Sequence, residues 1–167
     1  EEPNKNLFFI LIHDNQKRIS ATLKSRCVLF KLNLSYNDSV DILHNIIGKK
    51  IEDIINEEFI NYYFTPGEII NLINFAKENN IDLQNITLKK LLISIINEGH
   101  FKKNSFIKFY IFNLIQNYFI KLINNSKSNK NIFLLYYKFV NMYFKCNTYN
   151  LNYENLFMEI KLKILYE

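Results

Sequence analysis

The chain has 167 residues, 49% of them hydrophobic, and a formal net charge of +5. A chain of about this length buries roughly 68–70% of its unfolded surface, so we expect a folded protein. Only 3 glycines and 2 prolines are present, too few for the turns of a many-stranded sandwich or barrel, which excludes an all-β fold. The charge permits contact with nucleic acid but does not require it.

Basic residues are almost all lysine, since Arg18 and Arg26 are the only arginines among 21. Abundant lysine, isoleucine and asparagine are typical of an AT-rich genome, so an arginine is the more informative residue here. The two cysteines, Cys27 and Cys146, form one disulfide at most and cannot complete a four-ligand zinc site. This cysteine usage predicts a reducing, cytoplasmic compartment.

The start of the chain reads as the interior of a longer protein. Its first residues, Glu1-Glu2-Pro3, are neither a start methionine nor the basic end of a signal peptide. No apolar run approaches the ~20 residues of a membrane span, so we expect no membrane contact.

Two short apolar segments predict strands of a parallel sheet, at residues 7–12 and 27–32. Residues 18–24 lie between them and are long enough for about two helical turns. The first 33 residues therefore predict the last strand–helix–strand part of an α/β domain.

Three helices follow, in a predicted bundle over residues 34–80. Ser35 and Asp38 resemble a capping box that opens a helix ending at Gly48. Apolar residues at helical spacing from Ile51 to Ile60 predict a second helix, which ends before Thr65. Thr65 as N-cap and Pro66 at the first helical position start the third.

A polar stretch, residues 78–85, is the candidate hinge before an all-α domain over residues 86–167. Periodicity predicts helices at 87–98, 104–124, 131–145 and 152–165, with a loop at 126–129. The 104–124 helix is apolar around most of its circumference, so it is buried on most sides. It is either the central helix of this domain or part of an oligomeric seam.

The residues that carry chemistry in common enzymes are absent or unpaired in this sequence. No phosphate-binding glycine-rich loop is present, so the chain is expected to bind no nucleotide cofactor and to catalyse nothing by itself. The three histidines, His13, His44 and His100, have no metal-ligand spacing. We therefore expect no metal site.

One segment of the sequence carries a motif that is specific enough to suggest a protein family. Glu1-Glu2-Pro3 precedes the apolar run 7–12, and Thr22 opens the pattern Thr-x-x-Ser-Arg-Cys, which ends in Ser25-Arg26-Cys27. This arrangement resembles the second half of the AAA+ type ATPase domain in subunits of the bacterial DNA polymerase III clamp loader. The resemblance implies a fold that is mainly α: the tail of an α/β domain, then a three-helix lid and a helical collar.

Within that family the chain resembles the delta-prime type more than the gamma/tau type. Gamma/tau-like members carry a nucleotide-sensing arginine at the head of the third lid helix, where this chain has Thr65-Pro66-Gly67. Residues 149–152 are similar to the start of the last collar helix in delta-prime chains. His13 stands where such ATPases place a small polar sensor residue. The resemblance thus implies a subunit with degenerate sensor positions at His13 and Gly67.

The same resemblance implies a role for Arg26 as an arginine finger that acts in trans on ATP and Mg²⁺ bound to a neighbouring subunit. Ser25 and Cys27 would shape the turn that presents it, with Cys27 packed inside. The implied partners are gamma/tau and delta clamp-loader subunits, the sliding clamp and primed DNA. In the simpler structural alternative, Arg26 pairs with the carboxylate of Glu1 or Glu2.

Two other functions stay open from the sequence. The first is a gamma/tau subunit fragment. The second, from a different class, is an all-α nucleic-acid-binding module that uses the excess of lysine, and it predicts strong, steeply salt-dependent DNA binding.

Overall fold

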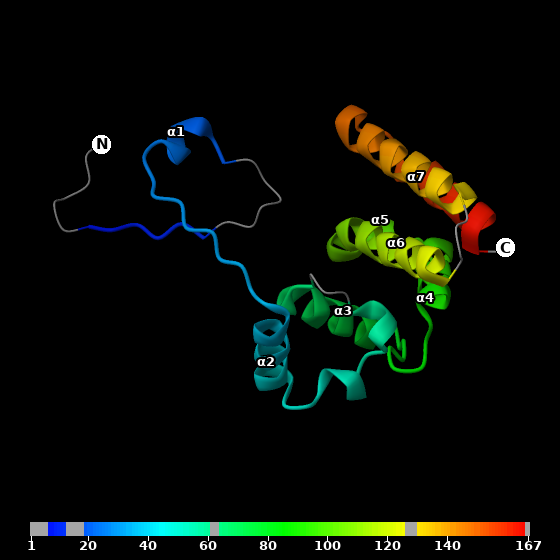
Figure 1. The fold of residues 1–167 in the computed structure, drawn as a ribbon, viewed down its shortest axis with the longest axis horizontal. Helices are drawn as coiled ribbons and strands as arrows, with labels where there is room; N and C mark the ends of the chain where they lie inside the picture. Colours follow the sequence, from blue (N-terminus) through cyan, green and yellow to red (C-terminus); the bar gives the residue numbers. More distant parts are fainter. Residues whose placement is uncertain (1–6, 13–18, 61–63, 126–129, 166–167) are drawn as a thin grey trace. The chain divides into compact units, whose positions relative to one another are not determined.

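Helices make up the regular structure of this protein. The computed structural model describes residues 7–12, 19–60, 64–125 and 130–165, and no strand occurs within these ranges (Figure 1). The mainly α fold class predicted from the sequence is confirmed. The chain divides into two compact units, Glu1–Asn33 and Leu34–Glu167, and each is described by itself.

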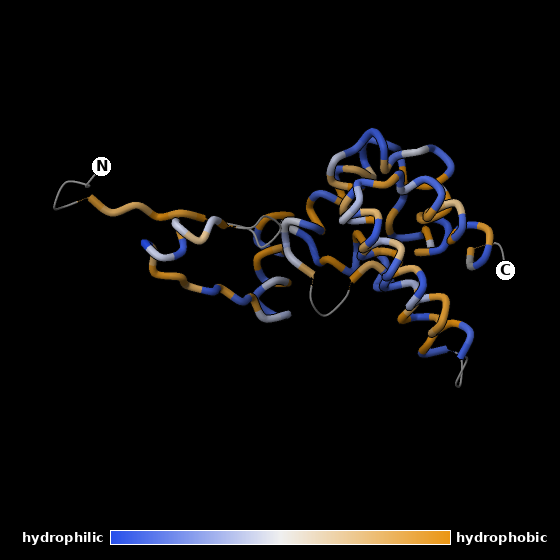
Figure 2. The backbone as a smooth tube through the Cα atoms, turned by 90° about the horizontal axis from the view of Figure 1, so that it is seen from above, coloured by the Kyte–Doolittle hydropathy of each residue, from blue (hydrophilic) through white to orange (hydrophobic). Residues whose placement is uncertain are grey.

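The predicted strands of the first unit are absent. Residues 7–12 are extended and exposed, and they form an almost continuous hydrophobic trace (Figure 2). Residues 27–32 are exposed as well, and neither segment shares backbone hydrogen bonds with another in the described part of this unit. A parallel β-strand forms only when it pairs with a neighbouring strand. An apolar segment that lacks such a neighbour therefore stays without regular secondary structure. The helix predicted between them is a single turn, α1 (Ala21–Lys24).

The second unit begins with α2 (Tyr36–Ile47), whose two ends were predicted correctly. The Ser35 Oγ accepts a hydrogen bond from the Asp38 N–H, and the Asp38 carboxylate accepts one from the Ser35 N–H, both at 3.2 Å. Gly48 ends the helix in the left-handed region with φ 72°, a conformation in which glycine has no Cβ to clash.

The predicted helix at 51–60 is instead a pair of 3₁₀ turns, η1 (Ile51–Asp53) and η2 (Glu57–Phe59). Asn56 interrupts the helix, because its side chain accepts from the Glu58 N–H at 3.0 Å while its own N–H bonds to the Leu83 carbonyl. Such local side-chain bonds compete with helical ones. The apolar side chains of this segment nevertheless face the core as the periodicity predicted: Ile51, Ile55 and Phe59 are buried, and Ile54 and Ile60 are partly buried.

Helix α3 (Pro66–Glu78) follows the prediction closely. Thr65 caps it, Pro66 occupies the first turn and Glu68 completes a capping box. The polar stretch after it contains Leu83, which is buried in the same continuous core as the helices on either side. The division into a lid at 34–80 and a collar at 86–167 stays a prediction.

The remaining helices agree with the predicted ones except for one short addition, α5, which begins after Gly99 at φ 66°. Helix α8 continues as a π-helical turn, η3, and the predicted loop at 126–129 lies outside the described residues. These elements are α4 (Leu88–Asn97), α5 (His100–Lys103), α6 (Ser105–Asn125), α7 (Lys130–Tyr149), α8 (Tyr153–Ile160) and η3 (Lys161–Leu165).

Helix α6 is the central helix of this unit. It packs against α4, α5, α7 and η2, and α7 lies alongside it (Figure 1). Seven of its residues are buried: Ile107, Tyr110, Ile111, Leu114, Ile115, Tyr118 and Phe119. Of the two readings that the sequence left open, the structure favours the central helix, because most of its apolar circumference is already covered.

Candidate functional site

The turn that carries Arg26 is built by local hydrogen bonds around α1. Ser20 caps the helix by accepting from the Leu23 N–H at 3.3 Å. After the helix, the Ser25 hydroxyl donates to the Thr22 carbonyl at 3.0 Å, and the Arg26 N–H donates to the Leu23 carbonyl at 3.1 Å. These hydrogen bonds close a tight turn at the C-terminal end of α1, and Arg26 is the last residue of this turn.

The Arg26 side chain is exposed and takes part in no ion pair within the described ranges. The alternative of pairing with Glu1 or Glu2 lies outside the described residues, and so does the predicted sensor position His13. A guanidinium presents five donors in a rigid plane that matches phosphate oxygens. The geometry therefore leaves Arg26 able to engage a phosphate supplied by another molecule.

Cys27 lies at the surface as a free thiol, and the prediction that it packs inside is wrong for this structure. All described residues from 20 to 33 are exposed, so the described part of this unit offers no core into which a small side chain could pack. The exposure of Cys27 could not have been predicted from the cysteine spacing, because the burial of a side chain depends on neighbouring residues that the local sequence does not specify.

Gly67, the second predicted sensor position, is at the second residue of α3. A Cβ added to Gly67 would meet no atom within 4 Å, and its φ is not in the left-handed region. Neither space nor backbone conformation therefore requires glycine here. Packing around the Cβ position therefore does not impose glycine at this point of the helix.

The head of α3 is fixed to α6 through Glu68, the neighbour of Gly67. Its carboxylate accepts from the Thr65 N–H at 3.1 Å and from the Asn113 Nδ2 at 3.3 Å. Burial, and then the negative charge of Glu68, raise the pKa of the Tyr110 hydroxyl far above its usual range. This tyrosine is therefore neutral at all physiological pH values.

A second carboxylate, Glu58, joins three elements that are distant in sequence. One oxygen accepts from the Leu88 N–H at the start of α4 at 2.8 Å, and the other pairs with the Lys121 ammonium of α6. Burial raises the pKa of Glu58, but both hydrogen bonds and the Lys121 charge outweigh it and hold that pKa below its usual range. We call this arrangement the Glu58 clasp.

Glu58→Ala is expected to lower the free energy of unfolding by about 1–3 kcal/mol at pH 7, because it leaves the Leu88 N–H and Lys121 without their acceptor. A carboxyl with a depressed folded-state pKa stabilises above its unfolded pKa, and this contribution disappears as the pH falls through the folded value. The difference from the wild type should therefore shrink below about pH 4. Urea titrations followed by circular dichroism measure it, with the exposed neighbour Glu57→Ala as control. A pH-independent difference would contradict the clasp.

Sequence reasoning missed an apolar surface on α7. Four exposed apolar residues follow one side of this helix, with a lysine at each end, and we call these six residues the outer face of α7. They are Lys130, Phe133, Leu134, Tyr137, Phe144 and Lys145. The signal was present, since apolar residues recur on both sides of the 131–145 segment, but the periodicity does not say which side is covered.

Neither a metal centre nor a membrane span is found in the parts of the chain that the structure describes. No group of three or more His, Cys, Asp or Glu side chains there could hold a metal ion. None of the helices in those parts is both long enough and apolar enough to pass through a bilayer.

The chain is similar to DNA polymerase III subunit gamma of Buchnera aphidicola subsp. Schizaphis graminum (strain Sg). The identity is 33% over 108 residues, which cover 60% of this chain and 29% of that subunit. The chain thus spans less than a third of the length of this relative. No family model matches, and no solved structure does.

This similarity makes the chain a distant, partial homologue of a gamma subunit. It supports the clamp-loader family that the Ser25-Arg26-Cys27 segment resembles, and it does not favour the delta-prime type within that family.

Proposed function

We propose that this chain is part of a clamp-loader subunit of DNA polymerase III, of the delta-prime type, that works in DNA replication in the cytoplasm. The observation that carries the proposal is Arg26, an exposed guanidinium at the end of a closed turn in the only chemically specific motif. The similarity to a gamma subunit supports the same family.

In this proposal Arg26 completes the ATP site of a neighbouring subunit. Charge develops on the γ-phosphate oxygens during phosphoryl transfer, and an arginine inserted from a neighbour stabilises it. This chain would bind no nucleotide of its own, and its helical unit would assemble with gamma/tau and delta subunits. The assembly would place the sliding clamp on primed DNA.

The delta-prime type is favoured over the gamma/tau type by Gly67. The chain carries no nucleotide-sensing arginine at this position, although a Cβ there would meet no atom within 4 Å. The coding sequence upstream of residue 1 discriminates the two types: we expect a degenerate phosphate-binding loop. An intact loop would favour the gamma/tau type.

The direct test is a loader reconstituted with the subunit that contains this chain. Clamp loading and DNA-stimulated ATP hydrolysis are measured for the wild type and for Arg26→Ala. Wild-type rates in the variant, with an intact fold and intact assembly, would contradict the trans role of Arg26.

The nucleic-acid-binding alternative has less support from the lysines in the second unit. Four lysines of the described residues lie in ion pairs with three carboxylates. These ion pairs are Lys102 with Glu154, Lys121 with Glu58, and both Lys138 and Lys163 with Glu159. We therefore expect weak DNA binding by the chain alone.

Fluorescence anisotropy with a primed DNA duplex at 50 and 200 mM salt measures this binding. A protein that makes 6–10 phosphate contacts loses about 10³–10⁵ in affinity over this interval. Tight binding with such a steep loss would favour the nucleic-acid-binding module over the loader subunit.

A further inference from the structure

Helix α7 is apolar on two opposite sides, and the unit covers only one of them. Its inner side packs on α6 through stacked rings: Phe112 lies 5.5 Å from Phe139 and 4.0 Å from Tyr143 between ring centroids. Tyr136 also accepts a hydrogen bond from the Gln116 Nε2 at 2.9 Å. This side anchors the helix.

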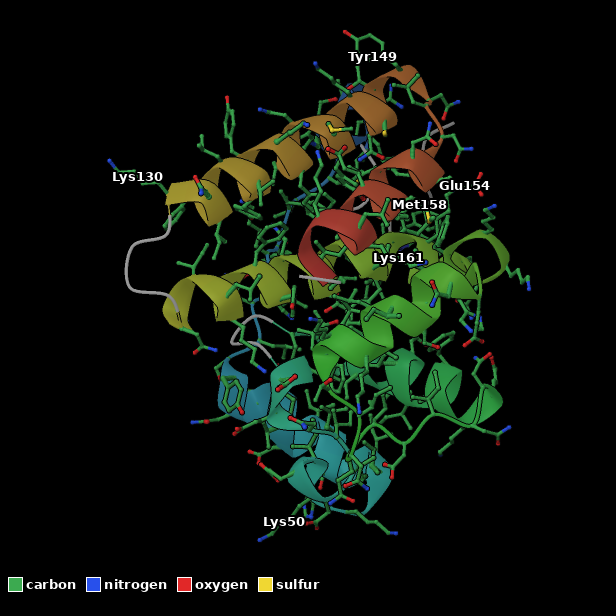
Figure 3. The ribbon with its side chains drawn as sticks, turned by 90° about the vertical axis from the view of Figure 1, so that its right-hand side faces the viewer. Lys50, Lys130, Tyr149, Glu154, Met158 and Lys161 are labelled. Atoms are coloured by element: carbon green, nitrogen blue, oxygen red, sulfur yellow. The ribbon has the colours of Figure 1, made fainter. Side chains whose placement is uncertain are left out.

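The outer face of α7 points away from these contacts. Its four apolar side chains, Phe133, Leu134, Tyr137 and Phe144, are 53–67% exposed, and Lys130 projects from the edge of the unit (Figure 3). A surface helix that no other molecule covers carries polar residues on its solvent-exposed side. Exposed apolar side chains gathered on one side of a helix, here with the exposed Asn141 between Tyr137 and Phe144, are a feature of interaction sites.

The charged residues that helix α7 itself contributes are all positive. No aspartate or glutamate occurs between residues 130 and 149. Lys138, on the flank of the helix, pairs with Glu159 at 3.0 Å and shares this carboxylate with Lys163, whereas Lys130 and Lys145 form no ion pair with any residue of the described ranges. The outer face therefore presents apolar side chains between two uncompensated cations.

We propose that the outer face of α7 is the docking surface for an amphipathic helix of a different protein, one with an apolar ridge and acidic residues at its ends. Phe133, Tyr137 and Phe144 are four and seven residues apart, a spacing that places them on one side of the helix, as in helix–helix contacts. A shallow apolar hollow on the same helix, lined by Phe133, Leu134, Tyr137 and Val140 among others, receives the ridge. Acidic ends compensate Lys130 and Lys145.

Charge argues against two other occupants. In an antiparallel pairing of two copies through this face, Lys130 of one chain would meet Lys145 of the other, a like-charge contact without any carboxylate to relieve it. A membrane-surface helix carries many basic residues along a broad polar face, and this helix has only three lysines, Lys130, Lys138 and Lys145. A partner helix with acidic ends satisfies both the apolar and the charged part of the surface.

The inference rests on the proposed function, in which this chain works inside an assembly. Its test measures binding of the full chain to the gamma subunit of the same organism by isothermal titration calorimetry. Two double variants are compared with the wild type: Phe133→Ser with Tyr137→Ser, and Lys130→Glu with Lys145→Glu. Phe109→Ser is the matched control, because Phe109 is 58% exposed on α6.

We expect each double variant to bind at least tenfold more weakly, the control to bind like the wild type, and all four proteins to keep the wild-type circular dichroism spectrum. If the wild type binds gamma and both double variants bind equally well, the outer face is not the docking surface, while the proposed function stands. If the wild type does not bind gamma at all, the proposed function and the inference fail together.

Two further measurements examine the other occupants. Sedimentation velocity of the full chain detects a second copy, and co-sedimentation with vesicles of equal parts phosphatidylcholine and phosphatidylglycerol detects a membrane surface. We expect a monomer and no vesicle binding. Self-association or vesicle binding that the Phe133→Ser with Tyr137→Ser variant abolishes would overturn the assignment of a protein helix.

Discussion

Arg26→Ala is expected to slow ATP hydrolysis at the neighbouring site that this residue completes by about 10³-fold or more, the range found for arginine fingers supplied in trans. The loss should be catalytic, because the Arg26 side chain is exposed and forms no ion pair in the described part of the chain. The thermal midpoint of the isolated chain should therefore be unchanged. Single-turnover ATP hydrolysis in the reconstituted loader measures the effect.

Arg26→Lys separates charge from geometry. Lysine keeps the positive charge but lacks the planar, forked donors of a guanidinium, so most of the loss should persist in this variant. Lys24→Ala, which removes an exposed charge from the last turn of α1, is the matched control and should have the wild-type rate. Full activity in Arg26→Lys would show that this residue acts only through its positive charge, by long-range electrostatics, and that the guanidinium geometry is not required.

The features that the sequence predicted well are those with a local physical cause. The caps at Ser35, Gly48 and Thr65 depend on a side chain or a backbone conformation within four residues, so their residue types are sufficient evidence. The burial of Ile51, Ile55 and Phe59 was also predictable from spacing, although the backbone there forms 3₁₀ turns.

The features that escaped prediction depend on distant partners. The Glu58 clasp joins residues 30 and 63 positions apart, and no sequence window contains both contacts. The apolar run at 7–12 predicted a strand, yet pairing needs a neighbour that the pattern does not supply. At the candidate site, the motif was enough to identify Ser25 and Arg26 as candidate residues. It was not enough to predict that Cys27 is exposed.

Helix α7 is a second case in which the local sequence did not determine which side chains are buried. Its periodicity predicted a helix, and the structure buries only Phe139 and Cys146 of that helix fully. Periodicity reports that a side chain is apolar and does not report what covers it. In a subunit of an assembly, part of that cover belongs to another chain, so an apolar helix with few buried residues is evidence about partners as well as about the core.

Phe119→Ala is expected to lower the free energy of unfolding by about 3–5 kcal/mol, the largest stability loss among these variants. Phe119 is 1% exposed, and its ring centroid lies 5.2 Å from that of Tyr136 and 6.0 Å from that of Phe139. Truncation leaves a cavity where α6 holds α7. Urea unfolding measures the loss, and Phe109→Ala, on the exposed side of α6, should change it by less than about 0.5 kcal/mol.

The same substitution also tests how the docking surface is held. Because Phe119 anchors the inner side of α7, its removal should weaken partner binding together with stability, whereas substitutions on the outer face of α7 should weaken binding alone. Equal unfolding free energies for Phe119→Ala and Phe109→Ala would contradict the packing of α7 on α6. Partner binding that survives a large loss of stability would show that docking does not require α7 to be fixed in this position.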